Sequence, residues 1–306
     1  MSGIEVQELE RRIVGEVLAV VGWSAGGPFG RVLGRAISSA VRRFAEVAAT
    51  CDRLVAERGF VVAGRWTFSQ FATDLQVEGV ERVPSAGPVV IASNHPGAVD
   101  ALALVVGSGR DDLKIVAWPM PFLEYLPHVS SHLICVSDDR RQRARAVWEG
   151  IRHLAHGGAL LLFARGRLEP DPATMPGAGE ELPHWSQSSE LFLRAVPEAS
   201  VVPTIVSGVL ARKYVRHPLT WVRRGRLARH RVAMILQFIQ QMRGKRVPLV
   251  PYVTFGAPLR GDTGREDLFA ALLHSSRVLL RAHVARWAER EALGATVRGD
   301  RSPPTA

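Results

Sequence analysis

Residues 89–100 of the chain read VVIASNHPGAVD, an uncharged run that leads into polar and turn-forming residues. The run from Val89 to Ser93 predicts a short buried strand. Proline is favoured in the first turn of a helix, so the following NHPG predicts a corner between this strand and a helix. His95 is therefore expected at the carboxyl end of a strand, where open α/β sheets bind ligands.

Strands and helices alternate on both sides of this segment. Further strands are predicted at residues 75–79, 113–117, 134–137, 159–163, 201–206 and 251–255. Helical spacing of apolar residues is found at residues 100–106, 143–155 and 262–293. The alternation predicts an α/β fold with a mixed sheet flanked by helices.

The character of the sequence divides the chain into three parts. Residues 1–74 form an N-terminal segment rich in Ala, Arg and Val, in which two or three helices are expected around a Gly/Pro loop at residues 22–30. Residues 75–295 contain the alternating pattern and are expected to form the α/β domain. Residues 296–306 are polar and contain proline, so a disordered tail is expected there.

The composition excludes several classes of protein. The 306 residues are 47% hydrophobic and 22% charged, which excludes a disordered or collagen-like chain. Two cysteines, Cys51 and Cys135, supply neither a disulfide framework nor a four-ligand zinc set, and no metal site is expected. Because the chain has no run of about eighteen apolar residues, any membrane contact is expected to be peripheral.

Positive charge is concentrated in one stretch. The formal net charge is +10, and residues 211–246 contain eleven Arg and Lys residues and no acidic residue. This stretch could lie along an anionic membrane, with Tyr214 and Trp221 as aromatic residues of the interface. It could also bind nucleic acid, or it could be a solvated helix face in an arginine-rich chain.

His95 and Asp100 are candidates for a catalytic pair. In a regular helix two residues five apart would point in different directions. Because the Pro-Gly corner leaves His95 outside the helix, its ring can fold back to Asp100, which would then orient an imidazole base. The alternative is that Asn94 and His95 cap the helix and that Asp100 is a solvated acid of its first turn.

The segment from Asn94 to Asp100 resembles the NHxxxxD block of the glycerolipid acyltransferases. Later segments resemble further blocks of that family in the same order: FARGR at residues 163–167 stands at the place of its FPEGTR block, VPTI at 202–205 resembles its VPI block, and FGAPL at 255–259 resembles a late strand. The resemblance covers residues 75–260. It implies a glycerol-3-phosphate acyltransferase-like fold and an O-acyltransferase similar to the 1-acyl-sn-glycerol-3-phosphate acyltransferases.

The resemblance also implies roles for individual residues. His95 would be the general base, and Asp100 would orient it. Residues at the substrate would be Asn94, Gly97, Arg165, Gly166, Arg167 and Pro203. Backbone N–H groups near Gly97 could support the oxyanion.

The third block departs from the family pattern. Arg165 stands where the family has glutamate, Arg167 where it has threonine, and Leu168 where it has arginine. The family uses this block to bind the phosphate of the acceptor, so Arg165 and Arg167 are expected to do so here, while Glu169 could restore the missing carboxylate. The departure leaves an alternative open, a catalytically impaired relative that binds an anionic membrane, or less readily nucleic acid, through residues 211–246.

The implied reaction moves a fatty acyl group from acyl-CoA or acyl carrier protein to a hydroxyl of a lysophospholipid or glycerol phosphate, without a cofactor. Since acceptor and product are lipids, membrane contact is the favoured interpretation of residues 211–246, and no nucleic acid is expected as a partner. The expected location is cytoplasmic, peripheral on the inner face of the cell membrane. The long loop at residues 170–187 could be a lid, and Trp185 within it could line an acyl channel.

Overall fold

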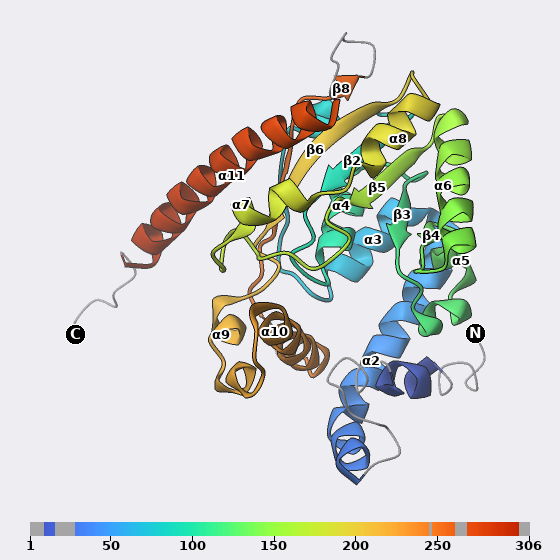
Figure 1. The fold of residues 1–306 in the computed structure, drawn as a ribbon. Coiled ribbons are helices and arrows are strands. Elements are labelled where there is room, and N and C mark those ends of the chain that lie inside the picture. Colours follow the sequence, from blue (N-terminus) through green and yellow to red (C-terminus); the bar gives the residue numbers. More distant parts are fainter. Residues whose placement is uncertain (1–8, 16–27, 245–246, 261–267, 300–306) are drawn as a thin grey trace.

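The computed structural model describes residues 9–15, 28–244, 247–260 and 268–299. Within this part of the chain the strands form an eight-stranded sheet of order β1-β7-β6-β2-β5-β3-β4, with β8 paired to β6 (Figure 1). The strands are β1 (Gln76–Glu78), β2 (Val89–Ser93), β3 (Lys114–Ala117), β4 (Leu133–Cys135), β5 (Ala159–Phe163), β6 (Ser200–Ser207), β7 (Tyr252–Phe255) and β8 (Leu259–Arg260).

The sheet is mixed. Strand β2 lies between β5 and β6 and pairs with both in parallel, and β5-β3-β4 continue the parallel part. Strands β7 and β8 run antiparallel to β6, and β1 is parallel to β7. Ser93 pairs with Phe163 and Thr204, so the carboxyl ends of the three central strands meet at one edge of the sheet.

Helices surround the sheet. The longer helices are α2 (Pro28–Arg58), α3 (Phe60–Phe68), α4 (Asp100–Ser108), α6 (Arg140–Ala155), α8 (Ser188–Ala195), α10 (Arg226–Met242) and α11 (Leu268–Gly299). Single turns are α5 (Pro127–Ser130), α7 (Ala178–Glu181), α9 (Arg212–Val215) and the 3₁₀ segments η1 (Val80–Arg82), η2 (Pro121–Tyr125), η3 (Leu182–His184) and η4 (Pro218–Val222).

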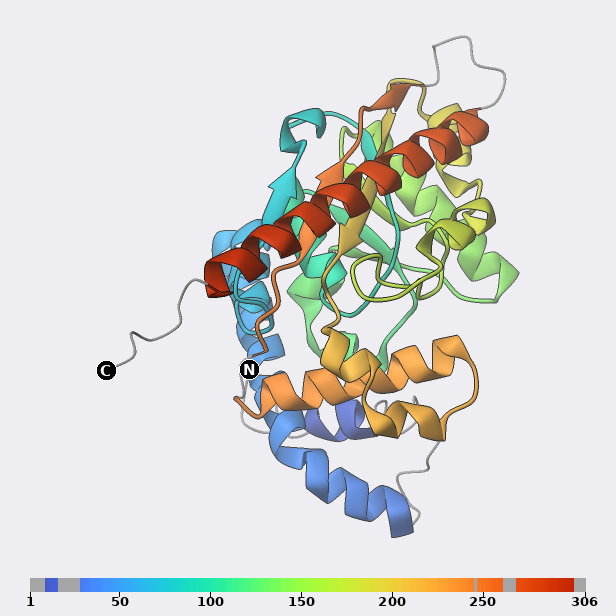
Figure 2. The same cartoon turned by 90° about the vertical axis from the view of Figure 1, so that its left-hand side faces the viewer.

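Alternate residues of each strand face different helices, as the two-residue period of a strand requires. Val89 and Ile91 of β2 join a core with residues of α2, α3, α4 and α10. Val90 and Ala92 join a second core with residues of α6, α8 and α11. Figure 2 shows α11 crossing the sheet diagonally. All five residues of β2 are buried because helices cover both faces of the sheet.

The predicted fold class, a mixed α/β sheet flanked by helices with a helical N-terminal segment, is confirmed. The predicted strands overlap β1 to β7. Helix α4 begins at Asp100, where the helical spacing of residues 100–106 begins, but Pro96 lies in the connection before the helix and not in its first turn. The division of the chain into domains stays a prediction.

Parts of the two terminal predictions fall outside the described residues. Of the Gly/Pro loop expected at residues 22–30, residues 22–27 lie outside them and residues 28–30 already belong to α2. Helix α11 runs to Gly299 and so includes residues 296–299, where a disordered tail was expected, while residues 300–306 are not described. No helix of the described segments has the length and apolar character that crossing a bilayer requires.

Candidate active site

His95 and Asp100 are in contact at the end of β2. The Nδ1 atom of His95 lies 2.8 Å from Oδ2 of Asp100. His95 stands two residues after β2, and Asp100 is the first residue of α4. The connection between them folds back, so the imidazole ring reaches the first turn of the helix. The two side chains that the sequence analysis paired therefore form a hydrogen-bonded pair.

Asp100 is buried and fully hydrogen-bonded. Its Oδ2 also accepts the N–H of Gly97 at 2.9 Å, its Oδ1 accepts the N–H of Ala101 at 2.7 Å, and the residue is 0% exposed. A solvated first-turn acid would be exposed, so the alternative interpretation of Asp100 is wrong. The N–H of Gly97 is directed at Asp100, and it is therefore not the donor that the oxyanion would need.

The second ring nitrogen of His95, Nε2, has different surroundings from Nδ1. Because the Asp100 carboxylate accepts a hydrogen bond from Nδ1, the neutral ring carries its proton there and keeps the lone pair on Nε2. Among the described residues, none forms a hydrogen bond with Nε2. The side chain is 29% exposed, and its ring stacks on Phe163 at the end of β5, with centroids 4.2 Å apart. Nε2 thus belongs to a ring that Asp100 and Phe163 hold in place but that is partly exposed to solvent.

Opposing effects act on the pKa of His95. Burial lowers the pKa, while the charge and hydrogen bond of Asp100, and the charge of Glu169, raise it. The net result is a pKa above the ordinary value of histidine. The ring is therefore a free base only above a pH that is higher than for an isolated imidazole.

Glu169 holds the backbone of His95 from the other side. Its Oε2 accepts the N–H of His95 at 2.9 Å, and its own N–H donates to the His95 carbonyl at 2.8 Å. Its Oε1 accepts the indole N–H of Trp185 at 2.9 Å. Burial raises the pKa of Glu169 to about 7, although these hydrogen bonds lower it. The sequence indicated a carboxylate at this position, but its bond to the backbone of His95 has no signal in the sequence.

Trp185 has a different role from the one expected. It is 3% exposed, donates to Glu169, and belongs to a buried cluster with Ala164, Leu182 and Ile205. It lines neither of the two cavities described below. The expectation that Trp185 lines an acyl channel is therefore wrong, because the ring is used to anchor Glu169.

Asp171 was not predicted as a site residue. Its carboxylate is 0% exposed and accepts four backbone N–H groups, those of Ala173, Gly208, Val209 and Leu210, at 2.9 to 3.0 Å. Burial raises the pKa of Asp171 to about 6, while the four hydrogen bonds lower it. Asp171 thereby fixes the chain that leaves β6 beside the His95 turn.

Asn94, Gly97 and Pro203 make close structural contacts. The Asn94 side chain accepts the N–H of Val206 at 2.8 Å and donates to its carbonyl at 2.9 Å. A Cβ on Gly97 would lie 3.0 Å from a methyl of Val209, and Pro203 is buried within β6. These contacts hold the ends of β2 and β6 together. The substrate-binding role that the resemblance implies for the three residues stays a prediction.

Arg165 and Arg167 line a cavity of about 220 Å³ beside the His95 turn. Gly166 between them has φ +66°, in the left-handed region that favours glycine, and turns the chain there. Glu181 of α7 and Arg226 of α10 are the other charged residues of the lining. We call this space the arginine cavity; its remaining lining residues are Leu168, Pro170, Met175, Leu227 and His230.

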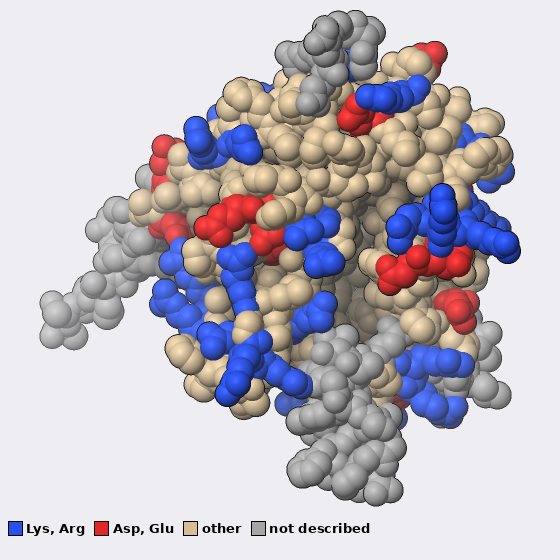
Figure 3. Space-filling model, viewed as in Figure 1, with Lys and Arg blue, Asp and Glu red and all other residues tan. Residues whose placement is uncertain are grey.

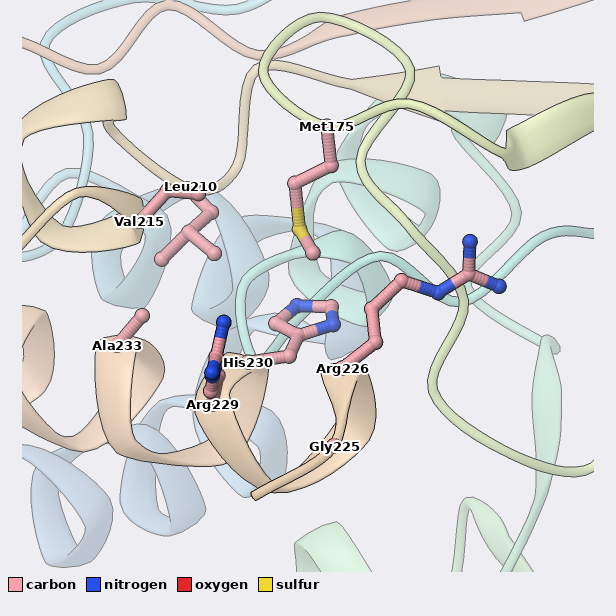
Figure 4. Close-up of a pocket in the computed structure, with 8 residues that line it drawn as sticks. All are labelled: Met175, Leu210, Val215, Gly225, Arg226, Arg229, His230 and Ala233. Atoms are coloured by element: carbon pink, nitrogen blue, oxygen red, sulfur yellow. The ribbon is translucent and has the colours of Figure 1, made fainter. Parts of the chain in front are cut away.

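A second, mainly apolar cavity of about 340 Å³ adjoins the arginine cavity, because Met175, Arg226 and His230 line both spaces. We call it the apolar cavity; its other lining residues are Leu210, Val215, Gly225, Arg229 and Ala233. Figure 4 shows Met175 reaching toward the His230 ring, with Leu210, Val215 and Ala233 to one side. The Arg226 side chain points away from that apolar group (Figure 4).

His230 connects both cavities to the His95 turn, and the sequence analysis missed it. Its Nε2 donates to the carbonyl of Pro96 at 2.9 Å. Burial lowers the pKa of His230, which keeps the ring neutral. Neither cavity is lined by His95 itself, so they adjoin the catalytic candidate through His230 and the Pro96 carbonyl.

The basic stretch forms η4, α9 and α10, and Lys and Arg side chains gather over these elements beside a hollow in the face shown (Figure 3). Trp221 and Val222 of η4 are 68% and 77% exposed. Arg229 lies over the Trp221 ring, 5.1 Å from its centroid. Tyr214 is only 4% exposed, so the expectation of a second interface aromatic is wrong. Its ring is part of the core that α9 forms with the sheet.

Replacement of Glu169 by glutamine should destabilise the protein at pH 8, where the carboxylate is ionised. A glutamine amide has one accepting oxygen, so the N–H of His95 or of Trp185 would be buried without an acceptor, at a cost of about 1–3 kcal/mol. Urea unfolding measures the effect. The control is Glu81→Gln, because the Glu81 side chain is 71% exposed. An equal free energy of unfolding for both variants would contradict this account of Glu169.

Comparison with known proteins finds similarity over part of the chain. Residues 74–207 match the Acyltransferase family model. No curated protein matches the chain. A solved structure of the 1-acyl-sn-glycerophosphate (LPA) acyltransferase PlsC from Thermotoga maritima is similar with a TM-score of 0.46 and 15% identity, over 92% of this chain and 97% of that one. The family match covers β1 to β6, the His95–Asp100 pair and both arginines of the third block, so this part of the chain is similar to the Acyltransferase family.

Proposed function

We propose that the chain is an O-acyltransferase in which His95 is the general base and Asp100 orients it. The observation that carries the proposal is the bond from Nδ1 of His95 to the buried Asp100, with Nε2 unengaged among the described residues. The match of residues 74–207 to an acyltransferase family supports the same assignment. A base of this kind contributes about 10²–10⁴ to the rate.

The proposed reaction has one acyl transfer step and no acyl-enzyme. Nε2 of His95 takes the proton of the acceptor hydroxyl while that oxygen attacks the thioester carbonyl. The carbon–sulfur bond then breaks, and the thiolate leaves with the proton that His95 returns. Asp100 stabilises the imidazolium between these two transfers. Acyl-CoA and acyl carrier protein present the same thioester, and no further cofactor is needed.

The proposed acceptor carries a phosphate, as a lysophospholipid or glycerol phosphate does. Guanidinium groups match phosphate oxygens in charge and geometry, and the arginine cavity contains three of them. Arg167 has no ion-pair partner in the part of the chain that the structure describes. A cluster of this kind supports recognition of an anionic acceptor close to His95.

The proposed site of the fatty acyl chain is the apolar cavity. Its volume of about 340 Å³ falls in the range of roughly 300–1,000 Å³ that is usual for small-molecule sites. Met175, Leu210, Val215 and Ala233 supply apolar walls. Because His230 and Met175 line both cavities, a lipid could place its chain in one and its phosphate in the other.

Peripheral contact with an anionic membrane, on the inner face of the cell membrane, completes the proposal. Trp221, Val222 and Leu219 of η4 are exposed, at 68%, 77% and 53%. Arginine residues surround them, and basic residues near an anionic surface contribute about 1 kcal/mol each. An exposed apolar cluster with a basic rim is typical of proteins that bind at a lipid interface.

Replacement of His95 by glutamine should lower acyl transfer by about 10²–10⁴, because the amide cannot take a proton at this position. Release of free thiol from acyl-CoA with a panel of lysophospholipids measures the reaction. The matched control is His128→Gln on α5, since His128 is exposed. Thermal midpoints for both variants separate catalysis from folding. Undiminished transfer by folded His95→Gln would contradict the proposal, and no transfer by the natural chain with any acceptor would favour the impaired relative.

Replacement of Trp221 by serine should weaken binding to vesicles that contain phosphatidylglycerol by about tenfold, the scale expected for one large apolar side chain. Trp148→Ser is the matched control, because Trp148 is 63% exposed and Arg152 lies over its ring, but it belongs to α6 on another side of the molecule (Figure 1). Vesicle sedimentation at low and high salt measures the affinity, and salt should weaken it. Equal losses in the two variants would contradict docking through η4.

A further inference from the structure

Glu181 bridges two arginines inside the arginine cavity. Its Oε2 lies 3.1 Å from Nε of Arg165, and its Oε1 lies 2.7 Å from Nη2 of Arg226. The side chains are partly shielded, with Glu181 18%, Arg165 24% and Arg226 47% exposed. The three residues come from the loop after β5, from α7 and from the first turn of α10. A carboxylate thus occupies the position between two guanidiniums that suits a phosphate.

The chain is shaped to hold this contact. Gly177, just before α7, has φ +94°, and a Cβ on it would collide with Nη1 of Arg226. On the other side of Glu181, Leu182 and Trp185 are 1% and 3% exposed. The segment at residues 170–187 is therefore packed against the protein beside Glu181 and is not an exposed, loosely attached lid.

We infer that Glu181 is a built-in competitor for an anion site formed by Arg165 and Arg226, and that a phosphate group binds there by displacing it. The inference deepens the proposed function and rests on it for the identity of the ligand. A phosphate carries about two negative charges and three accepting oxygens, whereas Glu181 carries one charge and two oxygens. A phosphate can therefore engage both arginines and also Arg167, which lines the same cavity.

This arrangement has a consequence for selectivity. The affinity of any anion is reduced by the fraction of molecules in which Glu181 holds the arginines. A ligand with a single charge gains little binding free energy when it displaces the Glu181 carboxylate, because it only replaces one negative charge with another. A phosphate gains more binding free energy because it carries more charge and more accepting oxygens. Arg226 lies outside residues 74–207, so the proposed anion site combines the family core with the basic stretch.

The phosphate could belong to the acceptor or to the coenzyme A of the donor. The recognising chemistry is the same in both cases, a phosphate between guanidiniums. Glycerol 3-phosphate and coenzyme A, titrated separately, distinguish these sources. Inorganic phosphate serves as the probe of the site itself.

The test is isothermal titration calorimetry of inorganic phosphate into the natural chain, Glu181→Gln and Glu180→Gln. Removal of the competitor should tighten phosphate binding about three- to tenfold. Glu180 is the matched control, because it is the adjacent residue of α7 but is 80% exposed and lies 3.8 Å from Arg226. Glu180→Gln removes the same charge from the same helix and should change the affinity by less than about twofold. Arg226→Gln added to Glu181→Gln should abolish the gain.

Three results would overturn the inference: equal affinity of the natural chain and Glu181→Gln, an equal gain in both glutamate variants, or no phosphate binding by any of them. Should Glu181→Gln fail to fold, Glu181→Asp withdraws the carboxylate by one methylene and should also tighten binding. The same gain with glycerol 3-phosphate assigns the site to the acceptor, and with coenzyme A to the donor; either result supports the inference. Binding is measured without turnover, so a chain that binds phosphate as expected but transfers no acyl group would refute the proposed function alone.

Discussion

The hydrogen bond between Nδ1 of His95 and the buried Asp100 carboxylate is the interaction on which the site depends. A carboxylate removed from water must find donors, and Asp100 has three, the imidazole and the N–H groups of Gly97 and Ala101. Two of these bonds pull the connection after β2 back onto the first turn of α4. The bond that orients the ring and the bond that shapes the turn thus end on the same oxygen, so ring and turn are positioned together.

Buried polar groups from distant segments support this turn. Glu169 accepts the N–H of His95, Asp171 accepts the N–H groups of the chain after β6, and His230 donates to the Pro96 carbonyl. The sheet brings the ends of β2, β5 and β6 to one edge, and these three side chains then fix the irregular chain beyond it. Hydrogen bonds of this kind fix the geometry of the site, which the proposed base catalysis would require.

The sequence predicts the sheet well, because β2 and β5 are uncharged runs buried on both faces, and this pattern is local. It also pairs His95 with Asp100. It places the start of the helical spacing at Asp100, where α4 begins, but Pro96 lies before the helix, in the connection that the bond between Gly97 and Asp100 holds. Asp171 and His230 could not be found from the sequence, because their partners lie 37 and 134 residues away. Tyr214 was misjudged because burial of one ring on α9 is decided by tertiary packing.

Titration of histidine-labelled protein by nitrogen NMR tests the state of His95 most directly, with Asp100→Asn as the comparison. We expect that the neutral ring carries its proton on Nδ1 and that the pKa of His95 lies above its ordinary value. Loss of the carboxylate charge should lower that pKa, because the charge favours the imidazolium. A neutral ring with its proton on Nε2, or a pKa that is unaffected by Asp100→Asn, would contradict the role of His95 as an oriented base.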